Sequence, residues 1–230
     1  MKYVGAFLAI VLAAYITAAQ TPPATQPSSG ASPVPRPSVV SPSWELNFEY
    51  QTPQMIEVAP PGEAKARVFW YMLYTVTNET GREQIFVPEL VRYSDTGKVS
   101  RAGEKVPAAV FAAVQSRHNN PLLKDQPAMT GKLLQGEDNA KDGVAIWPDL
   151  DEQAQGFDIF VGGLSGETEK IKLPTPTTVT VIDEEGNRKQ AVKDEAIVSK
   201  TLRLAYKLPG EYAARARTQP KLEKKEWVMR

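Results

Sequence analysis

The sequence predicts an all-β fold, an antiparallel β-sandwich with one short helix. Beyond residue 43, most of the chain consists of short stretches in which apolar and polar residues alternate, the pattern of strands with one buried face. Clusters of glycine, asparagine and aspartate separate these stretches and mark turns. Only one segment has the spacing of an amphipathic helix. Many short strands divided by turns are typical of two packed antiparallel sheets.

The strongest strand signal lies in residues 68–78. Trp70 and Met72 share one face of this stretch, and Phe69 and Tyr71 share the other. A strand that is apolar on both faces is covered on both sides. We therefore expect it at the centre of a sheet, with Trp70 in the core. The other predicted strands cover residues 44–50, 55–58, 84–87, 89–93, 143–147, 157–161, 170–173, 177–182, 189–192 and 197–208.

The one helix candidate begins at Pro107, because proline suits the first helical position, where its missing N–H costs nothing. The helix should end near Asn119, since Pro121 follows and the residue before a proline avoids helical geometry. An apolar stripe runs between these limits, made of Val110, Phe111 and Val114.

Two segments carry a resemblance to a known class of domain. The run Tyr74-Thr75-Val76-Thr77-Asn78, followed by Thr80-Gly81, resembles the core strand and turn of immunoglobulin-like domains in bacterial secreted proteins. Residues 143–147 and 157–161 look like the late paired strands of such domains. The resemblance implies an immunoglobulin-like sandwich and supplies no functional residue.

The beginning of the chain predicts export. A positive start precedes an uncharged apolar run over residues 3–19, which is short for a hydrocarbon core about 30 Å thick. Thr17 and Ala19 fit the small-residue pattern of a signal peptidase site. We expect a signal peptide at residues 1–19 and a secreted or periplasmic protein, with a bacterial style of signal. The alternative is an uncleaved N-terminal signal anchor in the membrane.

The rest of the chain divides at residue 43. Residues 20–43 are rich in proline and serine and predict a disordered spacer. Residues 44–230 form the predicted β-sandwich domain, with a C-terminal β-hairpin extension over its later strands. The charged end of the chain, residues 221–226, is expected to be solvated, with Trp227 docked against the domain.

Composition narrows the classes of function. Acidic and basic residues number 27 each, and loss of Lys2 with the signal would change the formal charge from +0 to about −1. Such a chain lacks the basic surface that nucleic acids attract. It has no cysteine, which excludes disulfides, thiolate ligands and a cysteine nucleophile.

The acidic stretch after residue 148 is the first candidate site. Asp149, Asp151 and Glu152 could supply a carboxylate pair for acid–base catalysis. Asp138, Asp142 and Asp149 also fall at ligand positions of an EF-hand-like calcium loop. Position 3 of that loop is an alanine without a side-chain oxygen, so a solvated acidic loop is the competing interpretation.

Other candidates have simpler structural explanations. His118 is the only histidine, and a helix C-terminus favours a partly protonated imidazole without any catalytic role. Ser165 lies in a glycine-rich turn that does not match the Gly-x-Ser-x-Gly nucleophile motif. Asn78-Glu79-Thr80 matches a glycosylation acceptor sequence. The aromatic face with Phe69 and Tyr71 could bind a partner, but a covering layer explains it better.

These observations favour an exported, non-enzymatic binding or cell-envelope structural domain. No residue is assigned to catalysis, to a cofactor or to a metal, and the ligand stays open. The partner would be a protein or glycan of the cell envelope. The alternative is a carboxylate-based secreted hydrolase that uses the acidic stretch from Asp149 to Glu152.

Export is directly testable. If the peptidase cuts after Ala19, N-terminal sequencing of the secreted protein should begin at Gln20. Recovery of the chain with Met1 intact in a membrane fraction would contradict cleavage and support the anchor.

Overall fold

The structure is a computed structural model that describes residues 35–40, 43–183, 185–212 and 218–230. The predicted signal peptide, residues 1–19, lies outside the described residues, as does the spacer apart from 35–40 and 43. The strands are β1 (Asn47–Tyr50), β2 (Gln54–Val58), β3 (Arg67–Thr77), β4 (Gln84–Phe86), β5 (Glu89–Ser94), β6 (Val99–Arg101), β7 (Gly131–Leu133), β8 (Lys141–Pro148), β9 (Gly156–Gly162), β10 (Thr168–Ile182), β11 (Arg188–Lys207) and β12 (Lys221–Met229). The helices are α1 (Ala108–His118), α2 (Gln126–Met129) and the 3₁₀ turn η1 (Glu137–Asn139).

The predicted all-β character is confirmed, and each stretch predicted as a strand contributes to one of these strands. The first sheet is built on β3. β8 pairs with one edge of β3. β1 pairs with the C-terminal half of β3, and β2 pairs with its N-terminal half. All of these pairings are antiparallel.

The second sheet has the order β12–β11–β9–β5–β6, again with antiparallel neighbours. Residues 143–147 and 157–161 were expected to pair with each other, and that expectation is wrong. They form β8 and β9, which lie in different sheets because β8 pairs with β3 whereas β9 pairs with β5 and β11.

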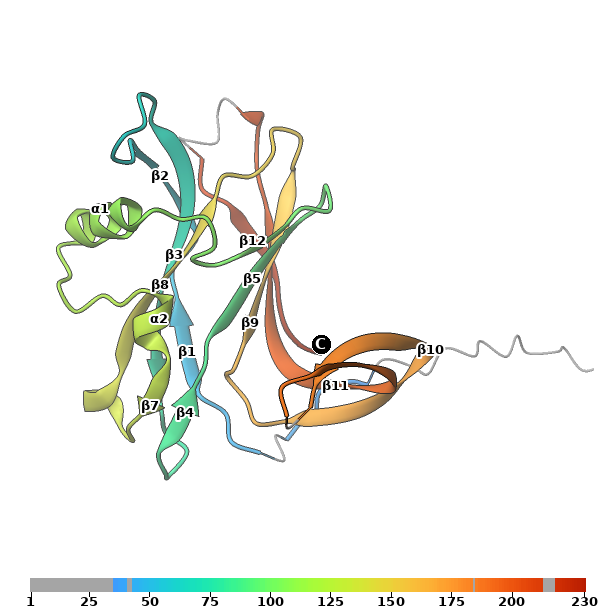
Figure 1. Cartoon of the computed structure of the whole chain (residues 1–230). Coiled ribbons are helices and arrows are strands. Elements are labelled where there is room, and N and C mark those ends of the chain that lie inside the picture. Colours follow the sequence, from blue (N-terminus) through green and yellow to red (C-terminus); the bar gives the residue numbers. More distant parts are fainter. Residues whose placement is uncertain (1–34, 41–42, 184, 213–217) are drawn as a thin grey trace, which may run out of the picture. The chain divides into compact units, whose positions relative to one another are not determined.

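Three layers result (Figure 1). The two sheets share one core, to which the first sheet contributes Trp70 and Trp147 and the second contributes Ile159 and Leu204. On the other side of the first sheet, α1 packs Val110 and Val114 against a second apolar cluster. The first sheet is therefore buried on both faces.

β3 carries the residues that join the two clusters. Trp70, Met72 and Tyr74 face the core between the sheets, and Phe69 and Tyr71 face α1. Both predictions for this strand are confirmed: Trp70 is 1% exposed, and the helix that begins after Pro107 covers the aromatic outer face.

α1 ends as its sequence predicts. Asn119 adopts a left-handed conformation (φ 46°) as the C-cap, and its backbone N–H bonds to carbonyls of the last turn. Pro107 serves as the N-cap rather than as the first helical residue. Arg117, in the last turn, donates to the Met55 carbonyl (2.9 Å) and fixes the helix end to β2.

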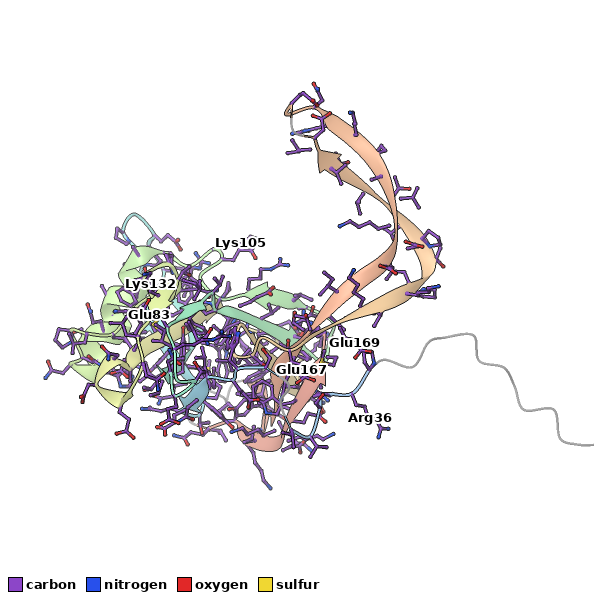
Figure 2. The ribbon with its side chains drawn as sticks, turned by 90° about the horizontal axis from the view of Figure 1, so that it is seen from below. Arg36, Glu83, Lys105, Lys132, Glu167 and Glu169 are labelled. Carbon is purple, nitrogen blue, oxygen red and sulfur yellow. The ribbon has the colours of Figure 1, made fainter. Side chains whose placement is uncertain are left out.

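The predicted β-hairpin extension is present and longer than expected. The paired segments of β10 and β11 run from Thr168 and Ser199 to Ile182 and Arg188, with a turn closed by hydrogen bonds between Asp183 and Asn187. We call residues 168–199 the arm. Figure 2 shows it leaving the sheets as a curved two-stranded ribbon.

The side chains of residues 221–225 are exposed, as expected for the charged end of the chain, but the sequence did not predict that this segment is a strand. Residues 221–229 form β12, an edge strand paired with β11. The sequence of β12 shows little alternation of apolar and polar residues, because most of its side chains face solvent. Trp227 packs against the main core, as expected.

The described end of the spacer contacts the domain. The Ser38 backbone N–H donates to Oε1 of Glu167 (2.8 Å), and Figure 2 shows Arg36 in this segment and Glu167 at the base of the arm. Ordered contacts thus begin before Trp44, where the domain was expected to start. The spacer interpretation stays a prediction for the remaining residues of 20–43.

Replacement of Trp70 tests the core. Trp70→Ala removes a buried indole and leaves a cavity, so we expect a loss of about 3–5 kcal/mol in the free energy of unfolding, measured by chemical denaturation. Ile85→Ala on β4 is the control, because Ile85 is 58% exposed. Equal stability of the two variants would contradict the assignment of Trp70 to the core.

Candidate functional site

The acidic stretch after β8 is tied to the core by hydrogen bonds. Oδ1 of Asp149 accepts from the Trp70 indole N–H (2.9 Å) and from the Leu150 backbone N–H (2.8 Å). Its other oxygen accepts from the Tyr212 hydroxyl (2.8 Å). Asp151 accepts from the Thr96 hydroxyl, a hydrogen bond that lowers the pKa of its carboxyl.

Beneath this stretch lies a buried arginine that sequence reasoning missed. Arg92, on β5, is 1% exposed. Its guanidinium donates to the Pro148 carbonyl (2.6 Å) and lies 5.8 Å from the centre of the Trp147 ring. Burial lowers the pKa of Arg92 to about 10, and the negative charges of Asp149 and Asp151 oppose this lowering.

This arrangement gives the acidic residues a structural role. A buried guanidinium is stable only when hydrogen bonds and opposite charge compensate its lost hydration. Asp149 and Asp151 supply that charge, and Asp149 also satisfies the indole of the core residue Trp70. A catalytic carboxylate pair in this stretch would first have to give up these partners.

The three carboxylates of the calcium-loop pattern are held apart. Asp142 accepts from Thr75 (2.8 Å) near one end of β8, and Asp149 lies just beyond the other end, about 20 Å away for an extended strand of this length. Asp138 is in the η1 turn. In the part of the chain that the structure describes, no group of His, Asp or Glu side chains could hold a metal ion.

Gly143, which follows Asp142 and falls at the turn-glycine position of the calcium-loop pattern, has a packing role instead. A Cβ at this position would lie 2.5 Å from Cζ of Tyr74 on the neighbouring strand. Glycine is therefore needed here for close approach of an aromatic ring, and the turn glycine of a calcium loop does not explain it.

His118 and Ser165 lie in separate parts of the fold. Nε2 of His118 lies 2.9 Å from the Tyr71 hydroxyl, which donates to Gln54 Oε1 (2.9 Å). Ser165 Oγ accepts from the Glu167 backbone N–H (3.1 Å) in the turn between β9 and β10. The two side chains have different partners, and no catalytic pair is formed between them.

The same turn positions a buried ion cluster. Nζ of Lys200 lies 2.9 Å from Glu45 and 3.5 Å from Glu167, and the lysine side chain is 5% exposed. The ammonium also lies 5.0 Å from the centre of the Trp227 ring. This cluster joins β11, β12 and the segment that contains Ser38, which hydrogen-bonds Glu167.

The glycosylation sequence is buried in the folded chain. Asn78 has no exposed surface, and its Nδ2 donates to the carbonyls of Arg82 and Leu133 (both 2.8 Å). The nitrogen that would accept a glycan is therefore committed to joining β3 to β7.

The outer face of the second sheet is the best candidate for binding. Two neighbouring rows of side chains cross its strands in register. One row is Val91, which is itself buried, followed by Phe160, Arg203 and Glu226, and the other row is Tyr93, Asp158, Ala205 and Lys224. Among the described residues no helix or further sheet is layered on this face, in contrast to the outer face of the first sheet.

Charge and aromatic groups are organised on this face. Arg203 pairs with both Asp158 and Glu226 (2.8 Å each). Tyr93 and Phe160 meet edge to face, with ring centres 5.3 Å apart. The Arg230 guanidinium lies over both rings, 4.7 and 4.6 Å from their centres, and hydrogen-bonds the Tyr93 hydroxyl.

A groove of about 430 Å³ opens beside these rows. Its polar lining comes from β5 and the turn after it and from β9, β11 and β12. The lining includes Tyr93, Asp95, Asp158, Arg203, Lys207 and Glu223. Sequence reasoning missed this site because its residues are far apart in the chain. The alternating outward residues of the predicted strands were the available signal, but the strand order was not.

No protein-family model matches this chain, and comparisons with curated proteins and with solved structures find no significant match. Among the described helices, none has the length and apolar character needed to cross a membrane.

The Lys200 cluster predicts sensitivity to acid. The Ser38 backbone N–H and the charge of Lys200 hold the pKa of Glu167 below its ordinary value, against the effect of burial. A lowered folded-state pKa stabilises the protein above the unfolded-state value of about 4.3, and this stabilisation is lost as pH falls through the folded pKa.

Glu167→Gln should therefore lower stability at pH 7 and flatten the loss of stability on acidification, measured by chemical denaturation between pH 7 and pH 3. Glu83→Gln is the control, because its pair with Lys132 is mostly exposed. Parallel stability curves for wild type and Glu167→Gln would contradict this role.

Proposed function

We propose that the protein is an exported, non-enzymatic binding domain of the cell envelope, built on an immunoglobulin-like sandwich. Its recognition surface is the outer face of the second sheet, with the groove between Tyr93, Asp158 and Arg203. The observation that carries the proposal is the in-register arrangement of charged and aromatic side chains on a sheet face with no covering layer among the described residues.

The chemistry of this surface suits a polar partner. Arg203, Asp158 and Glu226 offer fixed donors and acceptors, because each is already oriented by an ion pair. Tyr93 and Phe160 add aromatic surface beside them. Glycans combine hydroxyl groups with apolar ring faces, so an envelope polysaccharide is the partner that fits best. An envelope protein is the other class of partner with such chemistry.

The export signal and the proline-rich spacer support an envelope location, since they predict a domain held outside the cytoplasm. The alternative function, a carboxylate-based hydrolase, finds less support. Asp149 and Asp151 bond to Trp70 and Thr96 and lie near the buried Arg92, whose charge they balance.

Binding can be tested with a glycan array and an envelope polysaccharide fraction, followed by calorimetry on any polysaccharide that the exported chain retains. Arg203→Ala should weaken binding about tenfold or more, since it removes the central cation of the surface. Stability should change little, because Arg203 and its partners are only half-buried.

Lys132→Ala is the matched control, because it also removes a cation from a surface ion pair. Its partner is Glu83, beside the small sheet in which β4 pairs antiparallel with β7 (Figure 2). Equal loss of binding in both variants would reject this face as the site. Absence of binding to every polysaccharide and to envelope protein extract would reject the proposed function.

A further inference from the structure

The arm has two edges that differ in their capacity to pair with another strand. Over residues 168–182, β10 pairs with β11 and, among the described strands, with no other. Over residues 188–198, β11 pairs only with β10, because β12 joins it from Lys200 onward. Both outer edges of the arm are therefore free within the described chain.

The β10 edge is protected. Its register shifts between Lys172 and Thr177, and the intervening residues include Pro174 and Pro176. Prolines lack the N–H that a new strand would need, and a bulge breaks the even spacing of the edge. A further strand cannot form a regular ladder there.

The β11 edge is open. Residues 188–198 contain no proline, and their register with β10 is continuous from Arg188 to Lys193. Val192 is 71% exposed and Ile197 67% exposed, although both lie within a strand. A groove of about 660 Å³ beside them is lined by residues of both strands, and its apolar members include Leu173, Val179, Val192 and Ile197.

A two-stranded ribbon of this kind gives an isolated chain little stability. Such ribbons are marginally stable in water, and a third strand supplies both hydrogen bonds and apolar contacts. A regular edge with exposed valine and isoleucine is a template for strand addition. The arm is thus built to receive a strand along β11.

We propose that the occupant is the β11 edge of a second copy of this chain, paired antiparallel about a two-fold axis at Val192. In this register Val192 faces Val192 of the second copy, and Lys189 faces its Glu195. The opposite-charge pair occurs twice because of the symmetry, and directly opposed charges of opposite sign stabilise antiparallel strands.

Neighbouring registers are opposed by charge. An axis at Ala191 would place Lys189 opposite Lys193, and an axis at Lys193 would place two lysines opposite each other. The lysines of this edge therefore oppose the two adjacent registers, whereas the register at Val192 places Lys189 opposite a glutamate. This selectivity favours a second copy over an unrelated strand.

A charge exchange between two variants tests the pairing. Lys189→Glu puts two glutamates opposite each other in its own dimer, and Glu195→Lys puts two lysines opposite each other. Each variant alone should self-associate about tenfold more weakly than wild type, or weaker still. An equimolar mixture restores both opposite-charge pairs and should associate like wild type, measured by sedimentation equilibrium of the full exported chain.

The mixture controls for effects within one arm. Lys189 also pairs with Asp183 (2.8 Å) and Glu195 lies opposite Lys172, but these changes are the same in the separate and the mixed samples. A wild-type chain that stays monomeric at its highest soluble concentration would overturn the proposal. This result is also the one expected if a strand of another protein is the true occupant of the edge. A dimeric wild type whose variants fail to associate on mixing would also overturn it.

A cross-link locates the axis. The chain has no cysteine, so Val192→Cys introduces its only thiol, at the point where directly opposed strand residues lie within disulfide distance. It should form a covalent dimer on mild oxidation. Ile182→Cys, on β10 and 70% exposed, is the control and should stay largely uncross-linked. Equal cross-linking of both variants would contradict the register.

Discussion

The constraint on which the rest of the structure depends is that β3 buries both of its faces. Trp70 and Met72 must be covered on one side, and Phe69 and Tyr71 on the other. The second sheet meets the first need and α1 the second, so one strand determines a three-layer arrangement. Because α1 occupies the outer face of the first sheet, large uncovered sheet surface is left on the second sheet and on the arm.

Among the described residues, two cations are buried near the core, and acidic side chains placed beside them compensate their charge. Arg92 enters the space between the sheets and stacks beside Trp147, and the acidic stretch above it compensates its charge. Lys200 does the same with Glu45 and Glu167 where the arm begins. The residues that look most reactive in the sequence thus stabilise the fold, whereas the proposed binding groups lie at alternating, half-buried positions on the outer face of the second sheet.

The sequence predicted elements better than their arrangement. Periodicity located β3 and α1 because their burial patterns are strong and local, and it foresaw that Trp70 is buried. It could not foresee that β8 and β9 belong to different sheets, since pairing between distant strands leaves no local pattern. It also missed β12, whose side chains are mainly solvated, and Arg92, because nothing in the run from Glu89 to Ser94 distinguishes an inward arginine from an outward one. The candidate binding face could not be predicted from the sequence for the same reason, because its rows of side chains can be recognised only when the order of the strands is known.

Native-state hydrogen exchange tests this account most directly. If β3 is the centre on which both layers depend, the backbone amides of Trp70, Tyr71 and Met72 should exchange only through global unfolding. The amides of the small β4–β7 sheet should open at lower free energy, because that sheet has only two strands. Exchange of the β3 amides as fast as those of β4 and β7 would contradict the central place of this strand.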